Sequence, residues 1–77
     1  MTKITLRAAR INAGLTQMQV SKSLGIAPAT LSGWEKNSTK LSFLEAIKLA
    51  KLYHIQPDNI FFGKENEFIR SRKVGEN

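Results

Sequence analysis

The chain contains no cysteine, so it can form neither a disulfide bond nor a thiolate metal site. No apolar stretch approaches the ~20 residues that a membrane-spanning helix requires. Lys3 and Arg7 also place positive charge where the apolar core of a secretory signal peptide would have to lie. We therefore expect a cytoplasmic protein that has no membrane partner.

Groups that carry out catalysis are scarce as well. The sequence offers no nucleophile beside a base, no paired carboxylates and no cluster of metal ligands, and His54 is its only histidine. His54 falls where a helix should stop, and histidine tolerates the left-handed backbone conformation better than most residues. The sequence thus predicts no enzymatic activity, no metal or cofactor, and no small-molecule ligand.

Acidic residues are few compared with basic ones. Six Asp and Glu stand against twelve Lys and Arg, which gives a net charge of +6 in 77 residues. Because each Lys or Arg that neutralises a phosphate releases condensed counterions, this excess favours a polyanionic partner. Charge of this size also serves solubility, so it narrows the class of partner without deciding it.

What the sequence does contain is helical periodicity along nearly its whole length. Helix-start and helix-stop residues predict five short helices, at residues 2–13, 17–24, 28–36, 43–53 and 57–62. We therefore predict an all-α fold, a compact bundle of about five short helices. Residues 1–63 would form this domain, and residues 64–77 a polar C-terminal tail that serves dimerisation or is disordered.

Local signals fix several of these helix ends. Thr16 with Gln19, and Ser42 with Glu45, have the spacing of a capping box and predict the second and fourth starts. Gly25 and Asn37 are expected to end the second and third helices in the left-handed conformation. The fourth helix has an apolar stripe of Phe43, Ala46, Ile47, Ala50 and Tyr53. Two further leucines point away from it, and they indicate a contact surface: Leu44 and Leu52.

The most informative unit is residues 16–35, TQMQVSKSLGIAPATLSGWE. Two short helices joined by a glycine turn, with apolar residues on their inner faces, must pack at a steep angle. The start of the second helix, at Pro28, then projects from the body, and a helix of this size fits the ~12 Å major groove of DNA. The start of the first helix offers free N–H groups that suit a phosphate oxygen. Trp34, one turn from Leu31, is expected in the core.

These motifs together resemble the lambda-repressor-like helix-turn-helix domains of Cro, CI and Xre type, found in phage repressors and bacterial regulators. The resemblance covers about residues 3–63. It is carried by LRAARINAGLTQ, by the helix-turn-helix unit that ends in SGWEKN, and by SFLEAIKLAKLYHIQPDNIFFG. The resemblance implies that the protein binds double-stranded DNA with its third helix in the major groove.

The resemblance also implies a role for individual residues. Gln17 would contact the DNA backbone, and Arg10 would pair with Glu35. The base-facing positions would be Pro28, Ala29, Ser32 and Gly33, and the phosphate-facing ones Thr30, Lys36, Asn37 and Lys40. The predicted DNA-binding set is completed by the residues that precede the two helices, Thr16 and Ala27.

The chain departs from the family pattern at the base-facing positions. Pro28, Ala29 and Gly33 stand where long polar side chains are common, and none of them can make the bidentate contacts that specify guanine or adenine. Such a helix can contact thymine methyl groups through Ala29 and Pro28, form single hydrogen bonds through Ser32 and Thr30, and depend on DNA shape for the rest. Phosphate contacts should supply most of the affinity.

We therefore expect a sequence-specific transcriptional regulator, a repressor of Cro/CI/Xre type, that binds a pseudo-palindromic operator as a homodimer. An antitoxin or adaptor that uses the scaffold for protein–protein contacts is the alternative. The dimer surface would be either Leu44 with Leu52 or, as we favour, the aromatic chain end of Phe61, Phe62, Phe68 and Ile69.

Overall fold

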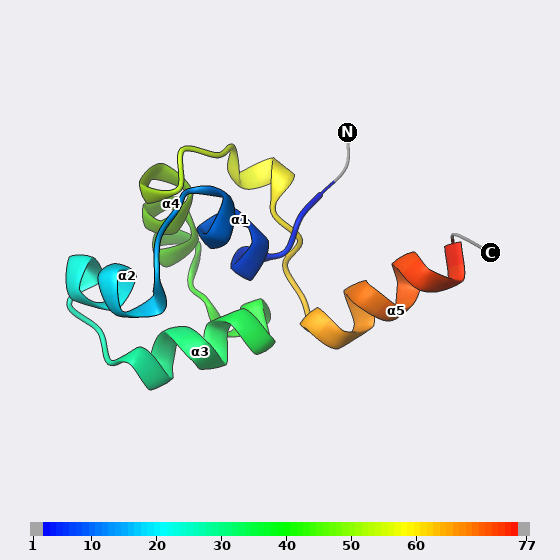
Figure 1. Cartoon of the computed structure of the whole chain (residues 1–77), viewed down its shortest axis with the longest axis horizontal. Helices are drawn as coiled ribbons and strands as arrows, with labels where there is room; N and C mark the ends of the chain where they lie inside the picture. The colour runs from blue at the N-terminus through cyan, green and yellow to red at the C-terminus, as the bar shows by residue number, and fades with distance from the viewer. Residues whose placement is uncertain (1–2, 76–77) are drawn as a thin grey trace.

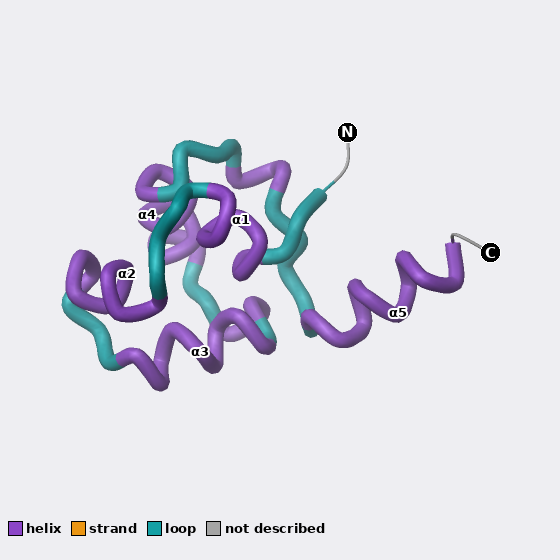
Figure 2. The backbone as a smooth tube through the Cα atoms, in the orientation of Figure 1, coloured by secondary structure: helices purple, strands orange, loops and turns teal. Residues whose placement is uncertain are grey.

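Helices make up most of the computed structural model, which describes residues 3–75 and the side chains as far as Arg70. The α-helices are α1 (Leu6–Asn12), α2 (Gln17–Leu24), α3 (Pro28–Lys36), α4 (Phe43–Leu52) and α5 (Glu65–Gly75), and the 3-10 turns are η1 (Ser38–Lys40) and η2 (Pro57–Asn59). Residues 3–75 contain two isolated β-bridges and no strand. The predicted all-α fold of five short helices is confirmed (Figure 2).

Both predicted capping boxes form. The Thr16 hydroxyl accepts a bond from the Gln19 amide, and the Gln19 side chain accepts one from the Thr16 amide, at 3.1 and 2.8 Å. Ser42 and Glu45 do the same at the start of α4, at 3.1 and 2.9 Å. Each box satisfies two backbone donors that a helix start otherwise leaves unpaired.

The helix stops agree with the sequence at two positions and differ at one. Gly25 has a φ of 69° after α2, and His54 has a φ of 55° after α4, both left-handed as predicted. Asn37 was predicted to be left-handed, and this is wrong, because it is extended with a φ of −149°. Asn37 instead pairs with Lys64 in an antiparallel bridge, and its side chain accepts a bond from the Thr39 amide at 3.2 Å.

The first and last predicted helices are also corrected. The N-terminal helix begins at Leu6 rather than at residue 2 or 3, because the Ile4 amide bonds to the Asn59 carbonyl at 2.9 Å. The same pairing, with the Phe61 amide bonded to the Ile4 carbonyl at 2.8 Å, keeps residues after Asn59 out of a helix. The predicted helix over 57–62 is therefore only the turn η2. The fifth α-helix lies at Glu65–Gly75, within the predicted tail.

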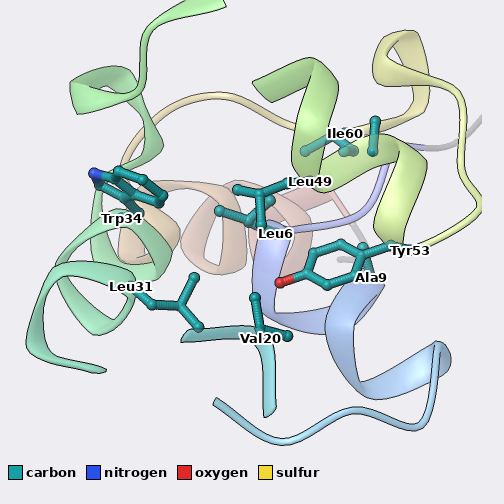
Figure 3. Packing of buried hydrophobic residues seen from close by; sticks show 9 residues of the cluster. Leu6, Ala9, Val20, Leu31, Trp34, Leu49, Tyr53 and Ile60 are labelled. Carbon is teal, nitrogen blue, oxygen red and sulfur yellow. The ribbon is translucent and has the colours of Figure 1, made fainter. Parts of the chain in front are cut away.

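The core lies among α1 to α4, with Ile60 closing one end (Figure 3). Its buried members are Leu6, Ala9, Val20, Leu31, Trp34, Leu49, Ala50, Tyr53 and Ile60. Trp34 is in the core, as predicted. The predicted stripe of α4 included Phe43, which is wrong: its side chain is 82% exposed, because it lines a surface hollow beside Leu41 and Phe62 instead of packing in the core. Leu49, which the stripe omitted, is fully buried in its place.

The last helix, α5, extends away from the body formed by the other four (Figure 1). It is attached near its start, where the Phe61 and Phe68 rings lie 4.6 Å apart and Arg7 Nη2 lies 3.2 Å from Glu65 Oε1. None of residues 65–70, the part of α5 whose side chains the structure describes, belongs to the core cluster. Among the helices of residues 3–75, none is long and apolar enough to cross a membrane.

Candidate nucleic-acid interface

The turn between α2 and α3 sets the direction of α3. The left-handed Gly25 lets the Ile26 amide turn back and bond to the Ser21 carbonyl at 3.0 Å. Ile26 then packs against the core, where Val20 of α2 and Leu31 of α3 are both fully buried. These contacts fix the two helices as one unit, with the start of α3 at its outer edge (Figure 1).

The start of α3 is exposed, while its later turns are anchored. Residues 27–30 are all exposed, and Ser32 and Gly33 are half-buried. Leu31, Trp34 and Glu35 are buried on the opposite face. The helix thus presents one edge outward and is held firmly along the other. All of the predicted base-facing residues lie on exposed or half-buried positions of this helix.

Glu35 is the buried centre of a polar network behind that edge. Its carboxylate is fully buried and accepts bonds from Arg10 Nε at 2.7 Å and from Gln17 Nε2 at 2.9 Å. Arg10 donates further to the Leu15 carbonyl, at 2.9 Å. A second arginine, Arg7, places its Nε 3.7 Å from the carboxylate. The network therefore joins α1, the start of α2 and the end of α3.

The roles of two residues in this network were not predicted from the sequence. Gln17 was assigned only to the DNA backbone, yet its side-chain amide nitrogen, Nε2, already donates to the Glu35 carboxylate. Arg7 received no role, although it precedes Arg10 by three residues and therefore lies on the same face of α1. That spacing was the signal available for finding it.

Tyr53, the residue that follows α4, lies close enough to Glu35 and Arg10 to be affected by their charges. Burial raises the pKa of its phenol well above the usual value, the Glu35 carboxylate raises it further, and Arg10 lowers it slightly. Its hydroxyl points into the core cluster (Figure 3), and this oxygen is buried without a hydrogen-bond partner among residues 3–75. The phenol therefore stays neutral and packs as an aromatic ring.

The remaining predicted phosphate-facing residues lie at the end of α3 and in η1. Lys36 and Lys40 are exposed, and Asn37 is half-buried between them. The bridge between Asn37 and Lys64 brings an additional exposed lysine to this segment. At the other end of the unit, Thr16 is exposed and Gln17 half-buried at the start of α2. Donors for phosphate thus lie at both ends of the exposed edge of α3.

The predicted dimer residues divide into two groups. Phe61 and Phe68 pack on each other, and Leu52 packs against the core. Of the predicted set, Leu44, Phe62 and Ile69 are exposed, and the unpredicted large apolar side chains of Phe43, Ile11 and Met18 are exposed as well. Phe43 and Phe62 line one shallow hollow with Leu41 and Ala46.

An exposed, anchored second helix after a glycine turn, flanked by exposed lysine and hydroxyl side chains, is the arrangement of a helix-turn-helix DNA-binding domain. A family model described as helix-turn-helix, of the Cro/CI/Xre type, matches residues 6–60. The chain belongs to this helix-turn-helix family, and DNA is the partner that the family implies. A sequence comparison with curated proteins gave no match.

Proposed function

We propose that this protein is a sequence-specific, double-stranded DNA-binding transcriptional regulator, a repressor of a phage or a bacterium. The observation that carries the proposal is the exposed edge of α3 at residues 27–30, backed by the buried Leu31, Trp34 and Glu35. A helix held in this way can enter the major groove without losing its own packing. Such a regulator acts on DNA in the cytoplasm. A repressor bound to its operator blocks RNA polymerase from the DNA.

In the docking that we propose, Gln17 and the amides at the start of α2 bind one phosphate. Within residues 3–75 the backbone N–H groups of Gln17 and Met18 have no acceptor, so they are free to do so, whereas the Gln17 side chain also donates to Glu35. Lys36, Asn37 and Lys40 would bind phosphates beyond the other end of α3. The bases between them would meet Pro28, Ala29, Ser32 and Gly33. Thr30, which the resemblance assigns to phosphate, would in addition reach a base edge, and Thr16 and Ala27 lie at the margin.

We propose further that two copies bind one pseudo-palindromic operator. One module with such small base-facing side chains distinguishes too few base pairs to select an operator among competing genomic sites. Two copies double the site and place the α3 helices one DNA turn apart, ~34 Å. The exposed side chains Phe43, Leu44 and Phe62, with Ile69 on α5, are the surface that we assign to the contact.

The test is selection of binding sites from random duplex DNA, followed by titration of the selected site at several salt concentrations. We expect one enriched sequence and a steep salt dependence. Lys40→Ala should weaken binding to all duplexes alike and reduce the salt slope by about 1. Gln17→Ala should also weaken binding generally. Lys51→Ala, which removes the same charge from the exposed side of α4, is the matched control and should change neither.

One observation favours a second function, that of an antitoxin or adaptor. Phe43 is 82% and Leu44 is 63% exposed, which is typical of a surface that another protein covers. If the full chain fails to bind any duplex even at low salt, the repressor proposal is wrong and the adaptor proposal is favoured.

A further inference from the structure

The first turn of α3 presents an apolar surface where DNA readers usually present long polar side chains. Ala27, Pro28 and Ala29 are exposed and carry only methyl or methylene groups. Thr30, also exposed, adds one methyl group and one hydroxyl. Charged side chains appear in this helix only at its end, with Glu35 buried and Lys36 exposed. The turn that would enter the groove first is therefore built for apolar contact.

The backbone of this turn offers few donors as well. Pro28 has no N–H group, and the Thr30 and Leu31 amides both bond to the Ala27 carbonyl, at 3.0 and 3.3 Å. Among residues 28–31 this leaves the Ala29 amide as the one backbone donor without an acceptor in the part of the chain that the structure describes. The first turn of α3 is thus poorly suited to the acceptor atoms of guanine or adenine.

One feature of the major groove matches such a surface. The C5 methyl group of thymine projects into the groove and is recognised by apolar contact, including contact with alanine and with the threonine methyl group. A methyl group at C5 of cytosine occupies the equivalent place on its base. We propose that the first turn of α3, principally Ala29 and Thr30, recognises the C5 methyl groups of pyrimidines in the operator. This inference rests on the proposed function and specifies which chemical group of the DNA the protein recognises.

The size of the effect follows from burial of one methyl group. The free energy lost when a buried methyl group is removed is about that of one buried methylene group, which corresponds to about fourfold weaker binding. Two half-sites that each lose one methyl group should therefore lose about 16-fold together when the sites act independently.

The test uses the full chain and the site selected from random DNA. Thymines of that site are replaced one at a time by deoxyuridine, which removes only the methyl group, and affinity is measured by fluorescence anisotropy. We expect about fourfold weaker binding at one or two thymines in each half-site and no change at the others. At those positions a C·G pair should bind weakly, and a 5-methylcytosine·G pair should recover part of the affinity.

A protein variant separates methyl contact from altered DNA shape. Ala29→Gly removes the alanine methyl group, so deoxyuridine should have much less effect on this variant than on the parent protein. Ala8→Gly, in the first turn of α1, controls for the lower helix propensity of glycine and should retain the full effect of deoxyuridine. Melting temperatures verify that both variants are folded.

The outcomes distinguish the two proposals. If no sequence is enriched, the proposed function is wrong and this inference falls with it. If a sequence is enriched but deoxyuridine at every thymine leaves the affinity unchanged, the methyl inference alone is overturned. The same holds if Ala29→Gly and the parent protein lose equally when the methyl group is removed.

Discussion

Glu35 is the one charged residue that is buried among those that the structure describes. Its carboxylate is fully buried, and the Arg10 side chain beside it is 12% exposed. Removing one partner from a buried ion pair leaves the other charge without compensation, which costs about 3–5 kcal/mol. Because small domains are only marginally stable, that cost is a large share of their total free energy of unfolding.

We therefore predict that Arg10→Met lowers the free energy of unfolding by about 3–5 kcal/mol, measured by urea denaturation. The double variant Arg10→Met, Glu35→Leu should recover most of this loss, because the buried carboxylate, which keeps only the Gln17 bond and the 3.7 Å contact with Arg7 in the single variant, is gone. Arg7, which is 42% exposed, can turn to solvent in the double variant. Equal losses in the single and double variants would show that the pair does not have this role.

For Tyr53 we predict that substitution does not lower the stability, in contrast to Arg10. Its ring packs in the core, but its hydroxyl is buried without a partner among residues 3–75. Tyr53→Phe keeps the ring and removes the unpaired group, so stability at neutral pH should stay the same or rise by about 1 kcal/mol. A loss of more than ~1 kcal/mol would contradict this assignment of the hydroxyl.

The raised pKa of Tyr53 also predicts a pH dependence. A phenol whose pKa is higher in the folded than in the unfolded state stabilises the fold fully below the unfolded pKa of about 10. As pH rises above that value, the unfolded chain ionises first and the stabilisation is lost. Raising the pH from neutral to about 11 should therefore lower the stability of the parent protein more than that of Tyr53→Phe, as measured by thermal denaturation.

The start of α3 offers a prediction about helix capping. Ala27 has the extended backbone of a helix cap, with φ −72° and ψ 144°, but its side chain makes no capping bond. Ala27→Ser supplies the missing hydroxyl and should add about 1 kcal/mol, which raises the melting temperature by roughly 4–8 °C. Ser42→Ala removes the corresponding bond from α4 and should lower it by a similar amount. An unchanged melting temperature for Ala27→Ser would show that α3 is satisfied in another way.

Helices whose ends are set by neighbouring residues were predictable from the sequence. The capping boxes at Thr16 and Ser42, and the left-handed Gly25, act over three or four residues and appear in the structure as expected. The errors have a different origin. Asn37 and the segment after Asn59 are extended because they pair with Lys64 and Ile4, which lie far away in the sequence. Local patterns carry no information about such pairing.

Which face of a helix is buried was harder to predict than how long the helix is. The period of α4 places Phe43 in line with Ala46 and Ala50, yet only the assembled body decides where the covered stretch begins. The candidate DNA-binding residues could be named from the motif. The bond between Gln17 and Glu35 could not, because it joins the start of one helix to the end of another.

The arrangement of exposed apolar residues predicts how two copies would meet. Phe43→Ser and Leu44→Ser together should remove cooperativity on an operator with two half-sites while leaving affinity for one half-site unchanged. Both side chains are exposed, so the fold should be unaffected. Ile11→Ser removes a side chain that is 58% exposed elsewhere and is the matched control. Gel-shift titrations that show full cooperativity in the double variant would place the contact elsewhere, with Ile69 next to be tested.

In the proposed complex the exposed edge of α3 and the start of α2 contact the DNA. The most direct test is titration of a short duplex carrying one half-site into nitrogen-15-labelled protein, followed by its amide NMR spectrum. We predict that the largest shifts occur at Gln17, Met18, Ala29 and Thr30, with little change in the first turn of α4. Large shifts centred on Phe43 and Leu44, with residues 28–33 unaffected, would show that DNA does not bind at α3.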